Sequence, residues 1–406
     1  MPVSTDLILN VLADYDIHPG LNDAAEIELP GVGKIEEGET VYSTSIDGIL
    51  RDSDDAGPLA ASLDMADDRV KNWYEQLMRI REGDWDIGDS WLREKQLDKG
   101  VPDPPEPHCA WYCPIHFFGH GWGIYVREQC ILSHALYVAA RVSWSEVSTT
   151  DWVRQLLRSA FYEFVLHEFF HHKVESLGLR LLIATGQDRY RPYKSNVYRP
   201  TLNTSGCLEE SLANAESHRR LDEKRFKDRL DPAIREALRT HLYLSFRAQP
   251  PGYAQAINYL DQVKFTRGLY NLQSQVLHAT LQPPMWPYHW AVAPNMITSL
   301  TDLTEEIYVI LPSGSRPIFR PGTIDPGPTA SSAELIGALT RYYGYGKVPG
   351  GKGSHVKLAR PGSPTIILPG NEAVLSPGVV KQALAAIGRY PLARLPDLLG
   401  GRLSRA

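Results

Sequence analysis

The pattern H-E-x-x-H at residues 167–171 constrains this chain more than any other feature of its sequence. It lies within residues 150–178, where apolar residues recur at helical spacing and where the only Pro or Gly is the final Gly178. Residues four apart share one face of a helix, so His167 and His171 can direct imidazole nitrogens at one point. Two neutral imidazoles at this spacing suit a zinc ion, with Glu168 beside them as a catalytic base. The segment therefore predicts a helix that ends near Gly178 and carries two zinc ligands.

The same pattern also arises by chance on a His-rich helix face that is open to solvent and needs no metal. Against this alternative, the motif is surrounded by large apolar residues, namely Phe164, Val165, Leu166, Phe169 and Phe170. A helix with this composition is expected to be mostly buried, and buried imidazoles and carboxylates need partners. The composition therefore favours a metal site.

A third zinc ligand is expected in residues 205–216, which follow a Ser-Gly loop signal and then become helical. Glu210 and Asn214 are four apart, in the pattern E-x-x-A-N, and so share one face. Glu210 is the predicted ligand, with Asn214 as a hydrogen-bond partner of a ligating side chain. Glu209 is the competing ligand. The alternative without metal is a solvated acidic first turn, which helices favour.

Together these two motifs resemble the gluzincin branch of zinc metallopeptidases, and the E-x-x-A-N form is similar to the ImmA/IrrE-type peptidases of bacteria and phages. The resemblance covers about residues 120–225 and depends on His167, Glu168, His171, Glu210 and Asn214. It implies a mixed sheet above an active-site helix, with a second helix that carries the third ligand. The chain departs from that family by a long insert, residues 179–206, expected to be irregular, and by an extra His172.

The resemblance also implies an edge strand just before the H-E-x-x-H helix, on which an extended peptide docks by adding a strand. A β-rich run lies at the corresponding place in this chain. The residues to which this substrate-binding role is assigned are Gly123, Ile124, Tyr125, Val126 and Arg127.

Just upstream, residues 109–120 contain two cysteines and two histidines in the pattern C-x3-C-x2-H-x3-H. A second metal site is one reading of Cys109, Cys113, His116 and His120. The spacing is tighter than in zinc fingers, so packing of small thiols in a core is favoured over a metal, and redox chemistry is a third alternative.

Length and composition indicate a globular protein of two or three domains. The chain has 406 residues, of which 43% are hydrophobic and 22% charged. No apolar run approaches the roughly 20 residues of a membrane span, so no membrane association is expected. The N-terminus lacks a basic start and a cleavage site. With only four cysteines, a disulfide scaffold is not expected, and the cytoplasm is the predicted location.

Composition shifts divide the chain into an acidic region, residues 1–105, partly integrated with the sheet of the next domain, and a zincin-like domain, residues 106–320. A Pro- and Gly-rich linker follows at 321–332, then a basic domain at 333–392 and a tail at 393–406. Residues 321–406 carry ten Lys/Arg and four Asp/Glu, a net charge of +6, whereas the rest carries −12. A basic module on an acidic body favours a polyanionic partner.

The basic domain has the predicted order helix–strand–strand–helix and resembles the HicA family of messenger-RNA interferases, whose fold is similar to that of double-stranded-RNA-binding domains. The matching residues are the G-S-H run that ends at His355, the strand ending at Pro369 and the helix 377–387. The resemblance implies a catalytic His355, and Lys352 and Lys357 would bind RNA phosphates. Family members often carry a second His after the conserved Pro, where this chain has Gly370-Asn371.

The predicted fold class is therefore α+β: a zincin-like domain with a mixed sheet and active-site helices, followed by a small α-β-β(-β)-α HicA-like domain. Two functions follow. The first is a Zn²⁺-dependent endopeptidase, with a protein substrate, whose basic module contacts RNA. The alternative is a HicA-like ribonuclease or RNA-binding effector whose attached peptidase cleaves a repressor or the chain itself. Such a fusion would suit a toxin or phage-defence system. A purely structural zinc is a third reading, which the water-activating Glu168 argues against.

Overall fold

The computed structural model describes most of the chain and has a mixed α+β fold, as predicted. The residues described are 3–19, 32–33, 35–36, 38–44, 46, 67–84, 109–280, 296–301, 307–315, 317–319, 330–349, 355–372, 375, 377–387, 395–401 and 403. The chain divides into two compact units, one formed by Met1–Ser45, Trp111–Tyr125 and Leu300–Ala406, and the other by Ile46–Ala110 and Val126–Ser299. Residues of the predicted domain 106–320 thus contribute to both units. No described helix is long and apolar enough to cross a membrane.

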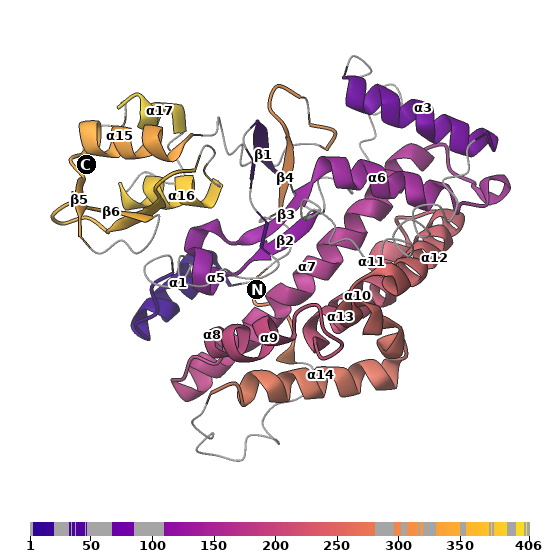
Figure 1. Cartoon of the computed structure of the whole chain (residues 1–406), viewed down its shortest axis with the longest axis horizontal. Helices are drawn as coiled ribbons and strands as arrows, with labels where there is room; N and C mark the ends of the chain where they lie inside the picture. The colour runs from indigo at the N-terminus through magenta and orange to yellow at the C-terminus, as the bar shows by residue number, and fades with distance from the viewer. Residues whose placement is uncertain are drawn as a thin grey trace. The chain divides into compact units, whose positions relative to one another are not determined.

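The second unit is built from helices (Figure 1). They are α3 (Asp68–Glu82), α6 (Glu128–Ala139), η3 (Trp144–Glu146), α7 (Trp152–Thr185), α8 (Tyr190–Tyr193), η4 (Lys194–Tyr198), α9 (Arg199–Thr201), α10 (Leu208–Arg220), α11 (Lys224–Lys227), α12 (Pro232–Ala248), α13 (Pro251–Ala254), η5 (Gln255–Tyr259) and α14 (Gln262–Leu277). α7 is the central helix, and α6, α10 and α12 pack along it.

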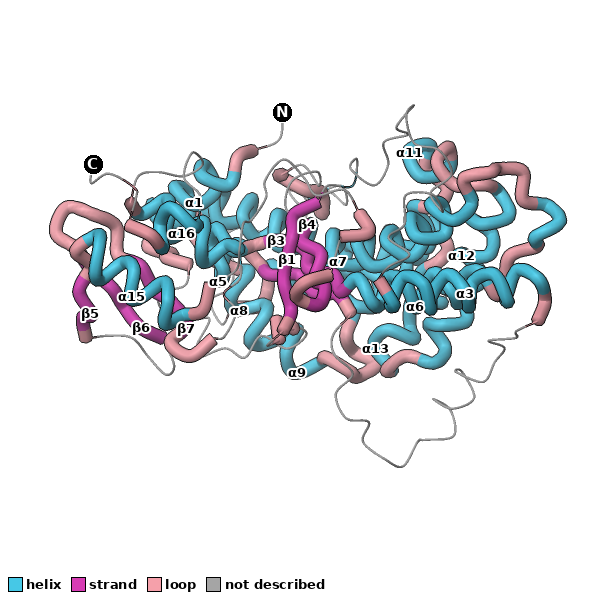
Figure 2. The backbone as a smooth tube through the Cα atoms, turned by 90° about the horizontal axis from the view of Figure 1, so that it is seen from above, coloured by secondary structure: helices cyan, strands magenta, loops and turns pink. Residues whose placement is uncertain are grey.

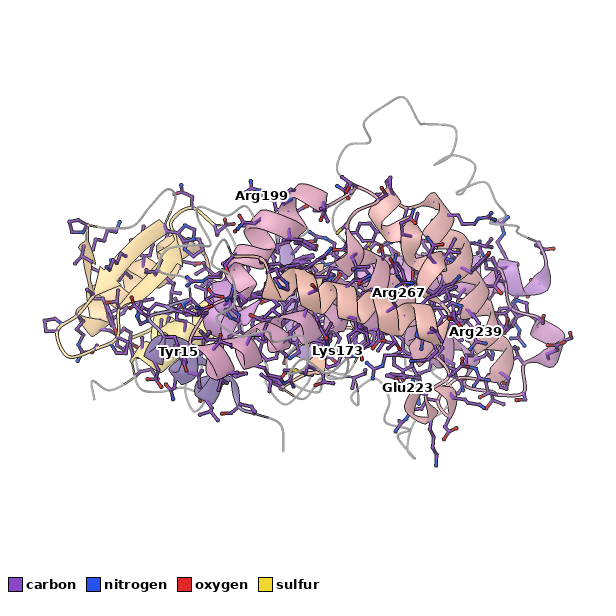
Figure 3. The ribbon with its side chains drawn as sticks, turned by 90° about the horizontal axis from the view of Figure 1, so that it is seen from below. Tyr15, Lys173, Arg199, Glu223, Arg239 and Arg267 are labelled. Atoms are coloured by element: carbon purple, nitrogen blue, oxygen red, sulfur yellow. A yellow bond between two sulfur atoms is a disulfide. The ribbon has the colours of Figure 1, made fainter. Side chains whose placement is uncertain are left out.

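α7 carries the H-E-x-x-H motif and is longer than the sequence predicts. It runs for 34 residues and ends at Gly186, whose φ of 70° gives the left-handed conformation that suits a helix end. The predicted end at Gly178 is therefore wrong. Gly178 instead allows a close approach, because a Cβ there would lie 2.6 Å from the Cβ of Tyr190. At the surface, the ammonium of Lys173 pairs with Glu216 of α10 and ties the two helices together (Figure 3).

The insert 179–206 is mostly helical, and the expectation of an irregular stretch is wrong. After the last turns of α7, the helical turns α8, η4 and α9 follow one another, and η4 is a single turn of π-helix. π-turns of this kind often occur at functional sites. The tyrosines Tyr190, Tyr193 and Tyr198 point inward and are buried. The insert is therefore part of the core of this unit.

The first unit contains a four-stranded sheet in the order β1-β4-β3-β2, together with a helix near the N-terminus and two short helical segments that follow β2. These elements are α1 (Thr5–Asp14), β1 (Glu39–Thr44), β2 (Ala110–Cys113), α5 (Ile115–Phe118), η2 (Gly119–Gly121), β3 (Gly123–Arg127) and β4 (Ile307–Pro312). β1 and β4 are antiparallel, with Glu39 opposite Pro312 and Thr44 opposite Ile307. The composition of residues 40–45, 307–311 and 317–320 predicts three strands. The structure confirms the first two, whereas residues 317–319 form no strand.

Three aromatic rings from adjacent strands pack together in the core of this sheet. Tyr125 of β3 stacks on Trp111 of β2 at 5.7 Å and on Tyr308 of β4 at 4.8 Å. Such cross-strand aromatic pairs stabilise a sheet beyond the area that they bury. β3 is therefore held on both sides and every one of its five residues is buried. The expectation that Gly123–Arg127 is an edge strand is wrong, because an inner strand has no free backbone groups to receive a peptide.

The C-terminal module of the first unit has the predicted order of elements, with one short strand and one short final helix more (Figure 2). It comprises α15 (Ser332–Tyr343), β5 (Gly346–Val348), β6 (His355–Ala359), β7 (Ile366–Pro369), α16 (Pro377–Ala386) and α17 (Leu395–Leu399). The strands form an antiparallel sheet in the order β5-β6-β7, with His355 opposite Pro369. The module has its own apolar core, centred on Leu335, Leu339, Leu358 and Leu368. Lys352 lies outside the described residues.

The four cysteines differ from the expectation. Cys109 and Cys130 form a disulfide, with their Cα atoms 5.5 Å apart, and Cys113 and Cys207 are free and buried. Cys109 is thus no thiolate ligand, and the C-x3-C-x2-H-x3-H pattern is not one of the metal-binding groups of the described residues. Cys113 and His116 are buried, as the packing interpretation expects.

Candidate metal centre

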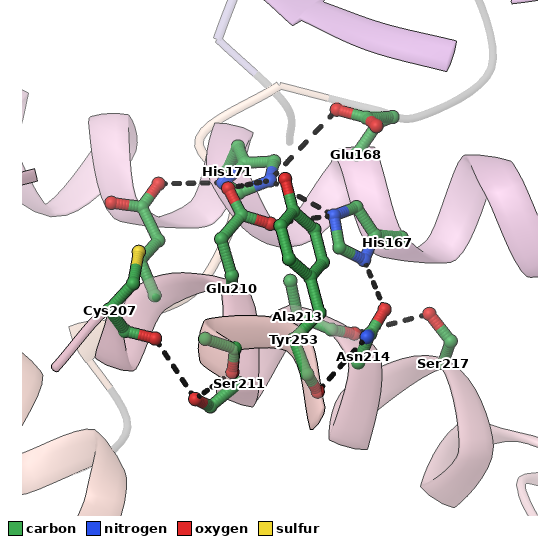
Figure 4. Close-up of polar contacts among 12 residues, drawn as sticks. His167, Glu168, His171, Cys207, Glu210, Ser211, Ala213, Asn214, Ser217 and Tyr253 are labelled. Atoms are coloured by element: carbon green, nitrogen blue, oxygen red, sulfur yellow. Dashed lines mark hydrogen bonds and ion pairs between the residues drawn. The ribbon is translucent and has the colours of Figure 1, made fainter. Parts of the chain in front are cut away.

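Three side chains from two helices direct their donor atoms at one point (Figure 4). The Nε2 atoms of His167 and His171, on adjacent turns of α7, are 3.3 Å apart. Glu210, in the first turn of α10, brings its Oε2 to 3.0 Å from Nε2 of His167 and its Oε1 to 3.6 Å from Nε2 of His171. The structure thus brings together the two histidines and the glutamate that the sequence singles out.

These separations fit a zinc ion. Zn²⁺ binds imidazole nitrogen and carboxylate oxygen at about 2.0–2.2 Å in tetrahedral geometry, which puts neighbouring ligand atoms roughly 3.3–3.6 Å apart. The three distances, 3.0, 3.3 and 3.6 Å, lie close to this range. Three protein ligands leave one position for water or substrate, as in catalytic sites rather than structural ones. The donor set is therefore able to hold a metal ion.

Asn214 fixes the orientation of His167. Its Oδ1 accepts a hydrogen bond of 2.8 Å from Nδ1 of His167. A proton on Nδ1 leaves the lone pair of Nε2 facing the other donors. The amide of Asn214 is itself held, because its Nδ2 donates to Oε1 of Gln249 at 2.6 Å and to the carbonyl of Tyr253 at 3.3 Å. The structure gives Asn214 the supporting position that the E-x-x-A-N spacing predicts.

Glu209, the competing ligand, orients His171 instead. Its Oε1 lies 2.7 Å from Nδ1 of His171, on the far side of the ring from Glu210. The Lys194 ammonium donates to the same oxygen at 3.2 Å and lies over the Tyr198 ring. Burial raises the pKa of Glu209, but Lys194 and His171 outweigh it, so the net pKa is lowered. The carboxylate thus stays ionised and can accept the Nδ1 proton of His171.

A residue of the insert 179–206 holds Glu210 in place. The hydroxyl of Tyr198, in η4, donates a hydrogen bond to Oε1 of Glu210. Burial opposes ionisation of Glu210, but the two histidines hold its pKa well below the usual range. Burial would likewise lower the pKa of His171, yet the Glu210 and Glu209 carboxylates raise it to about 10. The carboxylates therefore favour a positive charge at this point, either a proton on His171 or a metal cation in its place.

Glu168 points into the same site from α7. Its Oε2 lies 4.0 Å from Nε2 of His171, and the side chain is 10% exposed. Burial raises the pKa of Glu168 above its ordinary value, although the neighbouring imidazoles oppose this shift. A carboxyl group with a raised pKa, next to the open position of a metal site, is suited to accept and return a proton.

Tyr253 is a site residue that the sequence does not single out. Its ring stacks on His167 at 5.9 Å, and Figure 4 places it beside Glu210. Burial, and then the carboxylates of Glu210 and Glu168, raise the pKa of the Tyr253 phenol well above its usual range, so it remains a proton donor. Gly252 makes this position possible, since a Cβ there would lie 2.8 Å from the carbonyl oxygen of Thr204. The Pro-Pro-Gly signal before Tyr253 is the one local clue.

The remaining predicted residues lie elsewhere. The extra His172 is buried, stacks on Phe169 and has its pKa lowered to about 4 by burial. His355 and Lys357 belong to the C-terminal module, and Gly123–Arg127 form an inner strand.

Comparisons with protein-family models, with curated proteins and with solved structures found no match for this chain. The site is therefore interpreted from its own chemistry.

Proposed function

We propose that this chain is a zinc-dependent endopeptidase, with His167, His171 and Glu210 as the metal ligands and Glu168 as the general base. The observation that carries the proposal is the convergence of two imidazole nitrogens and a carboxylate, 3.0–3.6 Å apart, with a second carboxyl group beside them. Two histidines and a glutamate are the ligand set of several zinc peptidases. The second carboxyl group, that of Glu168, supports a catalytic rather than a structural metal.

Each side chain of the site has a different role in peptide hydrolysis. A zinc ion bound here would polarise the peptide carbonyl and lower the pKa of a water molecule. Glu168 accepts a proton from the attacking water and later passes it to the nitrogen of the leaving amine. The Tyr253 phenol can donate a hydrogen bond to the carbonyl oxygen as negative charge develops on it. Asn214 and Glu209 keep the two imidazoles in the required orientation.

The test is to map new protein N-termini after the purified, zinc-loaded chain is added to a cell lysate. Wild type should generate a reproducible set of new termini, and Glu168→Gln should generate none while it retains zinc. Glu236→Gln, which removes a carboxylate on α12 that pairs with Arg239, is the matched control and should cleave like wild type. A chelator should abolish the wild-type fragments.

Two outcomes would contradict the proposal. One is cleavage by Glu168→Gln at the wild-type rate. The other is a wild-type chain that carries zinc yet produces no fragment above the buffer control, either in the lysate or from itself. The second outcome would leave a metal site without peptidase chemistry.

A second candidate function belongs to the C-terminal module, and we propose that it binds RNA. The net charge of +6 over residues 321–406 supports this. His355 and Lys357 are two apart on β6 and so share one face of its sheet, while Lys347 is exposed on β5. Burial lowers the pKa of His355, and Glu372 offsets this only in part, so the imidazole is neutral near pH 7 and able to act as a base.

Filter binding of the full chain to single-stranded and double-stranded RNA tests this second function. The double variant Lys347→Glu/Lys357→Glu should lose affinity at least tenfold and show a shallower salt dependence. His355→Ala should bind like wild type, and any RNA cleavage that it abolishes would assign a catalytic role to His355. Affinity that is unchanged in the double variant would contradict RNA binding by this sheet, since Lys347 pairs with Leu358 and the two lysines lie on opposite faces.

A further inference from the structure

A second convergence of ligand-type side chains lies in the same unit as the metal centre. It consists of His134 of α6, Glu163 of α7 and His241 of α12. Nδ1 of His134 lies 3.2 Å from Oε2 of Glu163, and Nε2 of His241 lies 3.5 Å from the same oxygen. The three donor atoms lie within 4.8 Å of one another. Two imidazole nitrogens and one carboxylate oxygen thus meet at a single point, as they do at the first site.

Two of these side chains are buried and His134 is partly buried, and the three are not satisfied by one another. His241 is 1% exposed and Glu163 is 9% exposed. The three facing atoms have no hydrogen bond of acceptable geometry among the described residues, although both distances are short enough for one. Aromatic rings pack against both histidines. The ring centroid of Phe164 lies 4.6 Å from that of His134, and the ring centroid of Tyr137 lies 5.9 Å from that of His241. Buried polar atoms without aligned partners point to a further ligand.

An ion pair between Glu163 and a protonated histidine is the simplest alternative. It accounts for only one of the two imidazoles, because a second protonated ring 5.5 Å from the first, centroid to centroid, would repel it. A divalent cation instead accounts for all three groups at once. The distances of 3.2 and 3.5 Å fall where tetrahedral ligands of zinc lie relative to each other, at roughly 3.3–3.6 Å.

We propose that His134, Glu163 and His241 form a second binding site for a transition-metal cation, Zn²⁺ by ligand type. Magnesium and calcium prefer oxygen ligands, so a set with two imidazoles disfavours them. The inference is independent of the peptidase function, since it uses none of the residues of the first site.

The second site would join α6 and α7 to α12, which comes much later in the sequence. Glu163 precedes His167 by four residues, so the two sites lie on successive turns of α7, about 6 Å apart along its axis. A metal bound by α6, α7 and α12 would hold the two outer helices against the helix that presents His167 and His171. Its expected role is to stabilise the scaffold of the first site.

Metal content of the purified full chain, measured by inductively coupled plasma mass spectrometry after zinc loading and gel filtration, tests the proposal. Wild type should carry two zinc ions per chain. His241→Asn and His134→Asn should each carry one, as should His171→Asn, and the double variant His171→Asn/His241→Asn should carry none. His278→Asn is the matched control, since His278 is exposed after α14, and should carry two.

Several results would decide the question. Wild type with one zinc that His241→Asn retains would overturn the second site. Wild type with one zinc that is lost in His241→Asn but kept in His171→Asn would support the second site and count against the first. If the variants do not fold, judged by circular dichroism, anomalous scattering at the zinc edge from wild-type crystals replaces them. A peak bonded to all three donor atoms supports the proposal, and a peak at the first site alone overturns it.

Discussion

Asn214 accepts a hydrogen bond of 2.8 Å from Nδ1 of His167, and this contact helps to link the helix of the H-E-x-x-H motif to the helix of the third ligand. It also sets the tautomer of the imidazole, because a proton on Nδ1 leaves Nε2 free to bind a cation. Asn214 is in turn held by Gln249 and by the backbone of Tyr253. The position of Asn214 therefore couples the ligands to the segment after α12.

Removal of the Asn214 amide should weaken metal binding without changing the number of ligands. Asn214→Ala is expected to lower zinc affinity about 10- to 100-fold, as is typical when a partner of a metal-bound histidine is lost. Competition with a chromophoric chelator measures this change. Asn258→Ala removes an exposed amide from η5 that donates a local hydrogen bond to Gln255, and this variant should keep the wild-type affinity. Equal affinities in the two variants would exclude an orienting role for Asn214.

Lys194 should be more important for folding than its place in an insert suggests. Lys194 and Glu209 are 7% and 0% exposed, so Lys194→Met removes one of the two cationic partners of a buried carboxylate and leaves only His171. Loss of one partner of a buried pair costs about 3–5 kcal/mol in the free energy of unfolding. Urea unfolding should show this loss, and the double variant Lys194→Met/Glu209→Gln should recover part of it. Lys264→Met, on the exposed face of α14, is the control. A loss below about 1 kcal/mol would mean that solvent replaces the pair.

The local part of the site could be predicted from the sequence, because helical spacing alone places His167 and His171 on one face and Glu210 and Asn214 on another. The choice between Glu210 and Glu209 also follows from spacing, since Glu210 shares its face with Asn214. Lys194 and Tyr253 could not be predicted. Each reaches the site through tertiary packing, and a lone lysine or tyrosine carries no periodic signal.

The same distinction applies to the fold. Strands at 39–44 and 307–312 were recognisable from composition, but their pairing joins segments that lie far apart in the chain. The prediction that Gly123–Arg127 is an edge strand was wrong for this reason, because the position of a strand in a sheet depends on its neighbours and not on its own residues. The end of α7 was misplaced because Gly178 serves a close contact with Tyr190 and not a helix end.

The contribution of Asp231 to the free energy of unfolding should depend on pH. Its side chain caps α12 through the backbone N–H of Ala233 and accepts hydrogen bonds from the backbone and hydroxyl of Ser148. Burial raises the pKa of Asp231, but these hydrogen bonds outweigh it and lower the pKa below 3.8. The ionised group therefore contributes stability above pH 3.8, which is lost as the pH falls through the lower pKa of the folded state. Asp231→Ala should cost about 1–2 kcal/mol at pH 7.

Urea unfolding of wild type and Asp231→Ala at pH 7 and at pH 3 measures this difference. The gap between the two proteins should be widest at pH 7 and should shrink at pH 3. Asp228→Ala, just before this segment and exposed, should show no such gap. A gap that is constant with pH would mean that the side chain acts through packing and not through its charge.

Two helix glycines should respond in opposite directions to the same substitution. Alanine normally stabilises a helix interior by about 0.5–1 kcal/mol relative to glycine. At Gly337 of α15 no atom lies within 4 Å of an added Cβ, so Gly337→Ala should increase the free energy of unfolding by that amount. At Gly178 the added Cβ would lie 2.6 Å from the Cβ of Tyr190, which cannot move without displacing α8 from α7. Gly178→Ala should therefore lower the free energy of unfolding by about 1–3 kcal/mol. Denaturant unfolding of both variants provides the comparison, and a stabilising Gly178→Ala would mean that α8 does not pack on α7 at this point.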